Sequence, residues 1–327
     1  MINLHLVQNV RAKDLVIEPN RKGFGRGLLK AAEKDKDIVA ACADLTNSTA
    51  MDSFAAKFPE RYIEIGVAEQ NLVTVGAGLA AMGKIPFVSS YAAFSPGRNW
   101  EQIRTTICLN ERGVKIVGSH AGLSVGPDGA THQMLEDIAL MRVLPNMIVI
   151  VPADSLEAER ATLALAAEKE RPAYLRLARE AVPILTTDKT PFEIGKAYVY
   201  REGKDITLIT TGTMTYHMMV AAEVLAKDGI DAEVIHVPTI KPLDEETILK
   251  SLRKTGRAVI AEEAQIAGGL GGAIAELAAE RYPVPIKRIG MKDRFGESGD
   301  PNELLQHFGL TATHMAMAAH ELLAHKP

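Results

Sequence analysis

The fold is decided by the stretch from residue 62 to residue 90, YIEIGVAEQNLVTVGAGLAAMGKIPFVSS. Its two ends, residues 62–66 and 85–90, are short apolar runs with the length and composition of buried strands. Residues 71–83 between them are long enough for a helix and are mostly small or apolar. A strand, a helix and a strand in this order predict one unit of a parallel sheet.

The same alternation extends over most of the first 180 residues. Continuous apolar strands that alternate with helices are typical of a parallel sheet covered on both faces. The pattern predicts strands at residues 37–44, 62–66, 85–90, 114–119, 147–153 and 173–178. It predicts helices at residues 25–35, 71–83, 99–111, 132–144 and 155–170. We therefore expect an α/β fold.

A second α/β unit follows a segment with the composition of a linker. Residues 180–204 contain prolines and several threonines and have no helical period. Beyond them we expect strands at 205–212, 232–238, 257–263 and 286–291, and helices near 214–227, 244–254, 270–281 and 311–324. The 327 residues are therefore expected to form two domains, 1–190 and 191–327, each a mainly parallel sheet flanked by helices.

The composition is that of an ordinary globular protein. With a net charge of −4, the chain offers no broad basic surface for nucleic acid or an anionic membrane. Cys42 and Cys108 lack metal-ligand spacing, which predicts free, buried thiols in a reducing compartment. The first twenty residues lack the apolar core of a signal peptide, and no window approaches the ~20 apolar residues that span a bilayer. We expect a soluble, cytoplasmic protein.

Glu69 stands at the strand-to-helix corner of the opening stretch. In the first turn of a helix, unpaired backbone N–H groups favour an anion, so a plain helix-start carboxylate is one interpretation. The small residues of the following helix favour another, because they let a second backbone approach closely. A carboxyl group desolvated in such an interface can exchange a proton near neutral pH. The residues alone leave both interpretations open.

A second group of polar residues lies in VGSHAGLSVGPDGATHQ, residues 117–133. His120 is expected to end a strand, Asp128 lies in a loop rich in Gly and Pro, and His132 is expected to open a helix. Loops at the carboxyl ends of parallel strands bind ligands in open α/β sheets. Two histidines twelve positions apart match no compact set of metal ligands. The stretch therefore predicts a polar ligand pocket and no metal site.

Two further strand ends and a run of glycines are candidates for function. Tyr91 and Phe94 follow a predicted strand, where aromatic rings serve either core packing or ligand stacking. Arg176 and Arg179 lie at another strand end, where arginine forms ion pairs or holds phosphate or carboxylate groups. GGLGG (268–272) does not complete a dinucleotide-binding motif, because Ile274 stands at its last position. Tight packing of a helix on a sheet is expected there instead.

Taken together, these stretches resemble the C-terminal half of transketolase, a thiamine-diphosphate enzyme. The matching residues are IEIGVAEQN (63–71), YAAF (91–94), GSHAGLSVGPDGATHQ (118–133), LPNMIVIVPAD (144–154), EEAQIAGGLGGAIAE (262–276) and DRFGESG (293–299). The resemblance extends from about residue 20 to residue 320. It implies a pyrimidine-binding domain followed by a smaller C-terminal domain, with the boundary near the segment 180–204.

The resemblance implies roles for the residues nearest the cofactor. Glu69 matches the glutamate that hydrogen-bonds N1′ of the aminopyrimidine ring and so promotes removal of the thiazolium C2 proton. Phe94 matches the ring that stacks on the pyrimidine, and Tyr91 lies beside it. The expected cofactors are therefore thiamine diphosphate, bound through Glu69, Phe94 and Tyr91, and Mg²⁺.

The resemblance also implies roles toward a sugar substrate. His120 and His132 match histidines that polarise the sugar carbonyl and shuttle hydroxyl protons, so they join Glu69 as the expected catalytic residues. The expected substrate-binding residues are His120, Asp128 and His132 at the sugar and Arg179, Ser48 and Arg21 at its phosphate group. The implied reaction is the reversible transfer of a two-carbon ketol unit from a ketose phosphate to an aldose.

One motif of the family is missing from this sequence. Transketolases hold the diphosphate and its Mg²⁺ through a G-D-G motif and a downstream Asn in the other half of the enzyme, and this chain has no G-D-G. The resemblance therefore implies one subunit of a split transketolase, inactive alone, whose N-terminal partner subunit binds the diphosphate and the metal. A two-fold hetero-oligomer with two copies of each subunit is expected.

Three alternatives stay open. 1-Deoxyxylulose-5-phosphate synthase shares the A-E-Q and D-G-x-T-H-Q elements, but it usually has His where this chain has Asn71, and it lacks a match to His120. The β subunit of a 2-oxo acid dehydrogenase is also a separate chain of similar length, with a different glutamate context and histidine loop. A non-catalytic stabilising subunit is the third alternative, against which the presence of Glu69, His120 and His132 argues.

Overall fold

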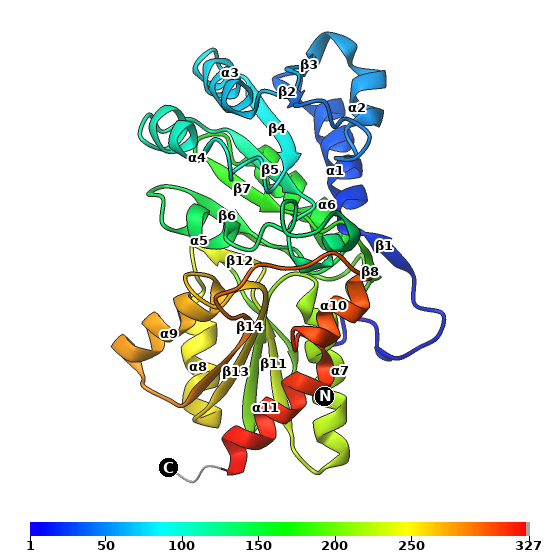
Figure 1. Cartoon of the computed structure of the whole chain (residues 1–327), viewed down its shortest axis with the longest axis vertical. Helices are drawn as coiled ribbons and strands as arrows, with labels where there is room; N and C mark the ends of the chain where they lie inside the picture. The colour runs from blue at the N-terminus through cyan, green and yellow to red at the C-terminus, as the bar shows by residue number, and fades with distance from the viewer. Residues whose placement is uncertain (325–327) are drawn as a thin grey trace.

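Two α/β domains lie one above the other in the computed structural model, which describes residues 1–324 (Figure 1). The upper domain contains a seven-stranded sheet and the lower one a five-stranded sheet. Most neighbouring strands in both sheets are parallel, and helices flank each sheet. The predicted α/β fold of two mainly parallel sheets is therefore confirmed.

The first sheet carries its helices on both faces. Its strands, in spatial order, are β12 (Thr239–Lys241), β6 (Ile148–Ile150), β7 (Ala173–Arg176), β5 (Lys115–Ser119), β4 (Ile85–Tyr91), β2 (Ile38–Cys42) and β3 (Tyr62–Glu64). One face is covered by α3 (Glu69–Ala81), α4 (Trp100–Gln102), the π-helix η2 (Ile103–Cys108) and α5 (Asp137–Arg142). The other face is covered by α1 (Asn20–Lys34), α2 (Asp52–Lys57) and α6 (Ser155–Ala167), with the single turn η1 (Pro59–Arg61) beside β3.

The second sheet is built in the same way. Its strands, in spatial order, are β14 (Ile286–Met291), β13 (Ala258–Gln265), β10 (Ile206–Thr210), β11 (Ala232–His236) and the antiparallel edge strand β9 (Tyr198–Arg201). Buried side chains of α8 (Glu245–Thr255) and α9 (Leu270–Arg281) pack on one face. The other face is covered by α7 (Met214–Lys227), α10 (Pro301–His307) and α11 (Ala312–Ala324).

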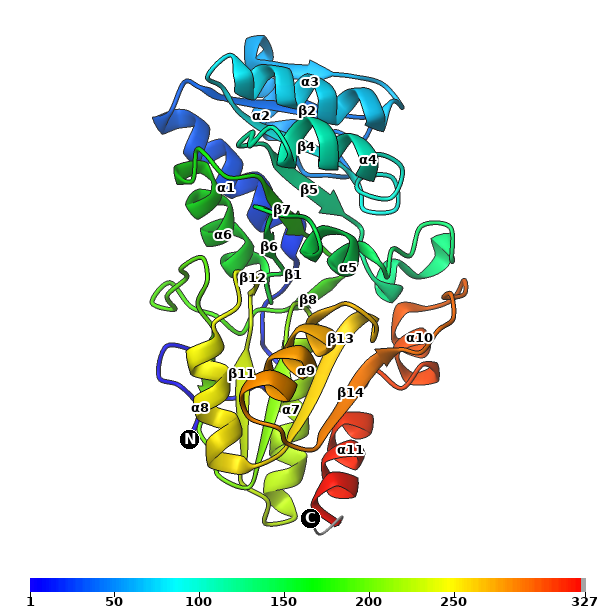
Figure 2. The same cartoon turned by 90° about the vertical axis from the view of Figure 1, so that its left-hand side faces the viewer.

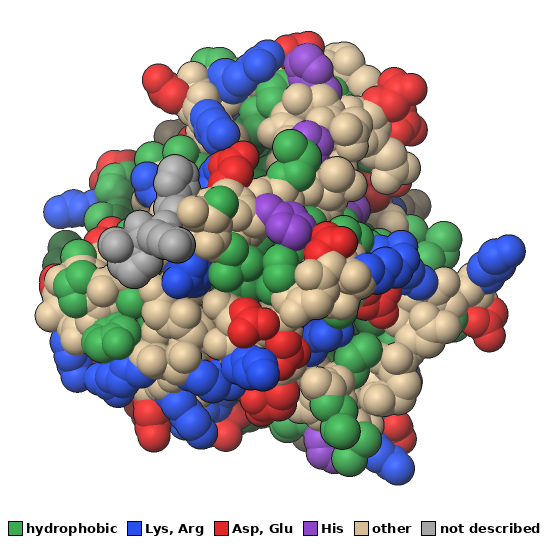
Figure 3. Space-filling model, turned by 90° about the horizontal axis from the view of Figure 1, so that it is seen from below, with side chains coloured by type: hydrophobic (Ala, Val, Ile, Leu, Met, Phe, Trp, Pro, Cys, Tyr) green, Lys and Arg blue, Asp and Glu red, His purple; other side chains and the backbone are tan. Residues whose placement is uncertain are grey.

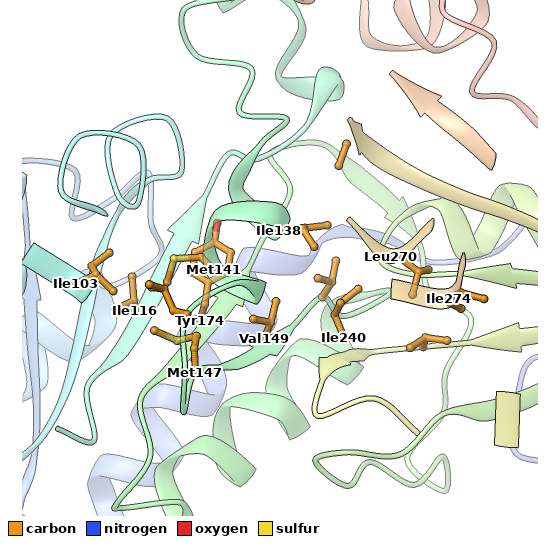
Figure 4. Packing of buried hydrophobic residues seen from close by; sticks show 14 of the residues in the cluster. Ile103, Ile116, Ile138, Met141, Met147, Val149, Tyr174, Ile240, Leu270 and Ile274 are labelled. Atoms are coloured by element: carbon orange, nitrogen blue, oxygen red, sulfur yellow. The ribbon is translucent and has the colours of Figure 1, made fainter. Parts of the chain in front are cut away.

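The two domains share one hydrophobic core. A single cluster of buried side chains runs from Ile103 and Ile116 in the first domain to Leu270 and Ile274 in the second (Figure 4). Strand β12 belongs to the second half of the chain but pairs antiparallel with β6 of the first sheet. Its Ile240 is 2 % exposed and lies in the middle of this cluster. The second domain thus completes both the sheet and the core of the first.

Several segments differ from the sequence-based prediction. The expected linker 180–204 contains β8 (Ala181–Pro183), which pairs with β1 (Ile17–Pro19), and also β9. Its residues 198–201 are aromatic or β-branched except for the last, which suits an edge strand better than a linker. The start of the segment 1–16 packs on the second domain, where Leu6 is buried and the Asn3 amide donates to the Tyr200 carbonyl over 2.9 Å. The domain division at residue 190 stays a prediction.

The first residue of the helix predicted at 132–144 is also wrong. Helix α5 begins only at Asp137, and His132 lies in a turn before it, not at a helix start. Residues 129–134 are held in turns instead, because the Gln133 side chain donates to the carbonyl groups of Leu123 and Gly126. These side-chain bonds fix a compact loop and compete with a helix.

The surface agrees with the charge of the sequence. On the face shown in Figure 3, basic and acidic side chains are interspersed. Among residues 1–324, no helix is both long enough and apolar enough to cross a bilayer. Both cysteines are free and buried, as predicted, and burial raises the pKa of the Cys108 thiol to about 11.

Candidate active site

The predicted site residues come from neighbouring strands of the first sheet. Strands β7, β5, β4, β2 and β3 are adjacent in this order and parallel, so their carboxyl ends lie at one edge. Each of these ends leads into one of the predicted residues: Arg179 after β7, His120 after β5, Tyr91 at the end of β4, Ser48 after β2 and Glu69 after β3. This edge is where open parallel sheets bind their ligands.

Glu69 is the first residue of α3 and is 2 % exposed. Its Oε2 lies 2.8 Å from Nη1 of Arg98, and its backbone carbonyl accepts a hydrogen bond from the buried Asn99 amide over 2.8 Å. The helix N-terminus and Arg98 both stabilise a negative charge here. The other carboxylate oxygen, Oε1, makes no hydrogen bond within the described part of the chain. Glu69 is therefore a buried carboxylate with one free acceptor.

Aromatic rings gather beside the end of β4. The Tyr91 ring stacks on the His120 imidazole, with centroids 4.0 Å apart and 25° between the planes. Phe94 lies 6.1 Å from Tyr91 and 5.3 Å from His132, measured between ring centroids. The Arg98 guanidinium lies 4.9 Å from the centre of the Phe94 ring. Arg98 thus touches both Glu69 and the aromatic group, which joins these predicted residues in one site.

His120 is buried among positive charges. Burial, followed by the nearby Arg21 and Arg179 guanidinium groups, lowers its pKa to about 3. Its Nδ1 lies 2.9 Å from the Ser119 hydroxyl, and its backbone has a φ of 55°. Histidine is one of the few residues besides glycine that tolerate this left-handed conformation. The imidazole is neutral at physiological pH and can share a proton with a ligand without carrying a charge.

The segment 120–132, which we call the histidine loop, leaves the end of β5 and returns to it. Ala121 pairs with Met134 in an isolated bridge, and the Gly122 amide donates to the Met134 carbonyl over 2.9 Å. Within the loop lies the short 3₁₀ segment η3 (Leu123–Asp128). His120 and His132 are therefore brought together although twelve positions separate them.

Asp128 and the two arginines lie on the same side of the site. The Arg179 guanidinium donates to the Val125 carbonyl over 2.5 Å and lies 3.5 Å from the Asp128 carboxylate. Arg21 donates to the carbonyl of Arg179. These contacts fasten the histidine loop to the end of β7 and bring two guanidinium groups toward His120.

Ser48 and Arg176, which were also candidates, do not join the group around Glu69 and His120. Ser48 is half-buried in the turn after β2, and within residues 1–324 its side chain makes no hydrogen bond to the other site residues. Arg176 is not free to hold an anion, because it is 6 % exposed and its Nε lies 2.7 Å from the Asp137 carboxylate. No group of three or more His, Cys, Asp or Glu within the described chain is placed to hold a metal ion.

The glycines 268–272 serve packing, as predicted. A Cβ atom on Gly269 would lie 2.0 Å from Oε2 of Glu262, a residue of β13. That carboxylate accepts hydrogen bonds from the Leu270 and Gly271 amides, both at 2.8 Å, at the start of α9. Only glycine lets the strand and the helix approach this closely.

Sequence reasoning missed Arg98 and Asn99. Both lie in the stretch YAAFSPGRNW (91–100), where the sequence-based interpretation rests on the aromatic residues alone. Arg98 is four positions from Phe94 in the same stretch, and a cation this close to an aromatic candidate was the available signal. Its pairing with Glu69 spans 29 residues and follows no sequence period.

Comparison with known proteins identifies the family of both domains. Residues 19–184 match the transketolase pyrimidine-binding domain, and residues 195–315 match the transketolase C-terminal domain. A solved structure of a split-gene transketolase, described as an inactive β4 tetramer, superposes with a TM-score of 0.88 at 44% identity, covering 94% of this chain and 99% of that one.

Several proteins with similar sequences support the same family assignment. The 6-deoxy-6-sulfo-D-fructose transketolase subunit SqwH of Clostridium sp. (strain MSTE9) is 44% identical, over 91% of this chain and 92% of the relative. A putative transketolase C-terminal section of Methanocaldococcus jannaschii is 44% identical over 90% of this chain and 93% of the relative. A 1-deoxy-D-xylulose-5-phosphate synthase of Trichormus variabilis is 38% identical, and this chain covers 47% of its length. The chain therefore belongs to the transketolase family and contains its pyrimidine-binding and C-terminal domains.

Proposed function

We propose that this chain is the C-terminal subunit of a split, thiamine-diphosphate-dependent transketolase. It transfers a two-carbon ketol unit between a ketose phosphate and an aldose. The observation that carries this proposal is the juxtaposition of a buried carboxylate, Glu69, with the ring of Phe94 through Arg98 at the carboxyl edge of the first sheet. A charged carboxylate is rarely buried beside an aromatic group unless a partner or a ligand uses it.

The residues present fit the aminopyrimidine end of the cofactor. An aminopyrimidine is flat and basic, so it needs an aromatic or apolar face and a carboxyl group that can hold a proton. Phe94 and Tyr91 provide rings inclined by only 22° to each other, and Oε1 of Glu69 is the free acceptor. When bound, thiamine diphosphate supplies the carbon nucleophile that carries the ketol unit. Glu69 holds and returns the proton at the ring nitrogen.

The remaining residues act on the sugar. His120 is neutral because burial lowers the pKa of its imidazole to about 3, so it can donate to or accept from a sugar hydroxyl or carbonyl group. His132, whose ring centroid lies 5.3 Å from that of Phe94, and Asp128 are our candidates for contact with the sugar hydroxyls. We assign the substrate phosphate to the Arg179 and Arg21 guanidinium groups, with Ser48 as a further candidate contact.

The proposal includes a partner chain that supplies what this chain lacks. The sequence has no G-D-G motif, and within residues 1–324 no set of acidic residues, His or Cys is placed for Mg²⁺. We propose that an N-terminal subunit holds the diphosphate and Mg²⁺, in a hetero-oligomer with two copies of each subunit. The structural relative described as an inactive β4 tetramer supports the view that this kind of chain does not act alone.

The surface around Glu69 suits such a partner. Val67 is 71% exposed, Met82 is 81% exposed, and a Cβ atom on Gly78 would meet nothing within 4 Å. Val67 lies two residues before the buried carboxylate, whereas Gly78 and Met82 lie at the other end of α3 and just beyond it. We propose that a second chain packs along this helix and closes the site to water.

The test is reconstitution. The chain is co-expressed and co-purified with a candidate transketolase N-terminal chain from the same genome and assayed with thiamine diphosphate, Mg²⁺, a ketose phosphate donor and an aldose acceptor. We expect ketol transfer by the mixture and none by either chain alone. Consumption of pyruvate with glyceraldehyde 3-phosphate, without ketol transfer, would instead identify a 1-deoxyxylulose-5-phosphate synthase activity and overturn the proposal.

A further inference from the structure

We propose that Glu263, in the second domain, is a positioning residue that holds the histidine loop of the first domain in its working conformation. The claim that this conformation serves ketol transfer rests on the proposed function, whereas the contact itself does not. Glu263 lies on β13, is 3 % exposed, and is remote in sequence from every predicted site residue. The second domain would thereby take a direct part in building the sugar site.

Both carboxylate oxygens of Glu263 are used. Oε1 accepts a hydrogen bond from the backbone amide of Ser124 in the histidine loop over 2.5 Å. Oε2 accepts from the Thr213 hydroxyl over 2.9 Å, which fixes the orientation of the carboxylate within its own domain. The second domain thus orients the carboxylate, which accepts a hydrogen bond from the backbone of the first domain.

The loop is shaped to receive this carboxylate. Gly122 has a φ of 97°, and a Cβ atom at this position would lie 2.5 Å from Oε1 of Glu263. Any larger residue would collide with the carboxylate and would also be strained in this conformation. Gly122 lies two residues after His120, so a shift of this turn moves the imidazole as well.

Other contacts from the second domain hold the far end of the loop. Gln133, directly after His132, donates from Nε2 to the Glu297 carbonyl over 2.8 Å. Arg176 donates from one nitrogen to the carbonyls of Glu263 and Met134, at 2.9 and 3.3 Å. In both views the segment before α10 runs beside the loop that follows β5 (Figures 1 and 2). The second domain therefore holds the histidine loop at Ser124 and, through Gln133, at the residue that follows the loop.

These ties add to the bonds that Gln133 and Arg179 make to the loop within the first domain, and the glycine-rich backbone makes the additional ties useful. Gly122, Gly126 and Gly129 all have positive φ, and a kink at Gly126 interrupts the 3₁₀ segment η3. Glycines of this kind leave a free loop many conformations. A fixed ring stack, such as Tyr91 on His120 at 4.0 Å, requires that the loop be held from outside.

The neighbouring Glu262 is a natural control. It is equally buried, at 1 % exposure, and its carboxylate also accepts two hydrogen bonds, but both come from backbone amides at the start of α9 in its own domain. Removing its carboxylate perturbs the second domain without touching the histidine loop. Comparison of the two glutamates therefore separates positioning of the loop from general destabilisation.

The first experiment uses the full chain by itself. Hydrogen–deuterium exchange is followed in a peptide covering residues 121–134 for the wild type, Glu263→Ala, Glu263→Gln and Glu262→Ala. We expect about tenfold faster exchange in Glu263→Ala, because a buried amide loses its acceptor. Gln keeps an acceptor oxygen, so exchange in Glu263→Gln should lie within about threefold of the wild-type rate. Glu262→Ala should leave the exchange of this peptide unchanged. Unchanged exchange in Glu263→Ala, or an equal rise in Glu262→Ala, would overturn the proposal.

The second experiment uses the reconstituted enzyme. For Glu263→Ala we expect a fall in kcat of about 10²-fold with an unchanged affinity for thiamine diphosphate, because the histidines move while Glu69 and Phe94 do not. Glu263→Gln should recover most of the activity. A fall in cofactor affinity that equals the fall in kcat would indicate general damage and contradict the positioning role. If the wild type transfers no ketol unit, the proposed function fails, whereas the exchange experiment still decides the contact.

Discussion

At the scale of single residues, Glu69 shows how a charge is made tolerable in a buried place. A carboxylate taken out of water needs compensation, and here the start of α3 and the Arg98 guanidinium at 2.8 Å provide it. Asn99 fixes the backbone of the same residue through the Glu69 carbonyl. The side chain is therefore held through Oε2, and in the proposed function Oε1 is the atom that binds the cofactor.

Replacing Glu69 by Gln tests its role in proton exchange. Gln has nearly the same shape but cannot hold the proton that the proposed chemistry needs, so we expect kcat of the reconstituted enzyme to fall by about 10²-fold or more. The measurement is ketol transfer at saturating cofactor. Glu101→Gln, an exposed first-turn carboxylate of α4, is the matched control and should be neutral. An active Glu69→Gln enzyme would contradict the assigned role.

His120 makes the chain sensitive to acid. Its pKa is lowered from 6.5 to about 3, so the folded chain binds fewer protons than the unfolded chain between these values. The stability that depends on a neutral imidazole is therefore complete above pH 6.5 and is lost as the pH falls toward 3. At pH 5 we expect a loss on the order of 1–2 kcal/mol from this residue.

The measurement is urea unfolding at pH 7 and pH 5 for the wild type and His120→Asn. Asparagine tolerates a positive φ and does not titrate, so the variant should lose less stability on acidification than the wild type. The exposed His5→Asn serves as control and should follow the wild type. Equal losses in wild type and His120→Asn would refute the prediction.

At the scale of elements, one helix cap joins three segments. Asp154 is the N-cap of α6 and accepts from the Glu157 amide over 2.9 Å. The same carboxylate accepts from the amides of Leu185 and Thr186, at 2.9 and 2.8 Å, and is fully buried. The segment after β8 is therefore held by the start of a helix in the first domain.

This buried cap should contribute far more to the free energy of unfolding than an exposed cap does. Asp154→Ala leaves several buried donors without a partner, so we expect a loss of about 3 kcal/mol or more in the free energy of unfolding. Asp300, the exposed N-cap of α10, accepts from two amides, and Asp300→Ala should cost about 1 kcal/mol. Urea unfolding of both variants measures the difference. Similar losses for the two would show that the burial of Asp154 is not what matters.

At the scale of the whole molecule, we expect the two domains to unfold as one cooperative unit. One buried cluster contains side chains of both domains, and β12 from the second half of the chain pairs with β6 of the first sheet, so separating the domains would expose apolar side chains. The ion pair of Arg176 with Asp137, both buried, lies at the same junction and ties the end of β7 to the second domain through Glu263.

The single tryptophan allows this cooperativity to be tested. Trp100 lies in the first domain, where its Nε1 donates to the Leu140 carbonyl over 2.8 Å. Leu225→Ala, in the buried cluster of α7 in the second domain, should cost about 2–5 kcal/mol. We expect the Trp100 fluorescence and the far-UV circular dichroism to shift together in urea. A fluorescence midpoint that stays at the wild-type value would show that the domains unfold separately.

Local patterns were sufficient for much of this protein. Apolar runs and small-residue helices predicted both sheets, and strand ends pointed to Glu69, Tyr91, His120 and Arg179, because a parallel sheet places all its carboxyl ends at one edge. The predicted start of α5 was wrong because the Gln133 side chain hydrogen-bonds to the backbone of the preceding loop. A hydrophobic period in the sequence contains no information about such a bond.

The sequence by itself determined the α/β architecture and the row of candidate residues, because both depend on short-range periodicity and on residue type. Only the tertiary structure decided that β12 completes the first sheet, that Arg98 holds Glu69, and that Glu263 grips the histidine loop. These contacts join residues that are distant in the chain. Each is selected by the geometry of the assembled core, and geometry of that kind leaves no local signature in the sequence.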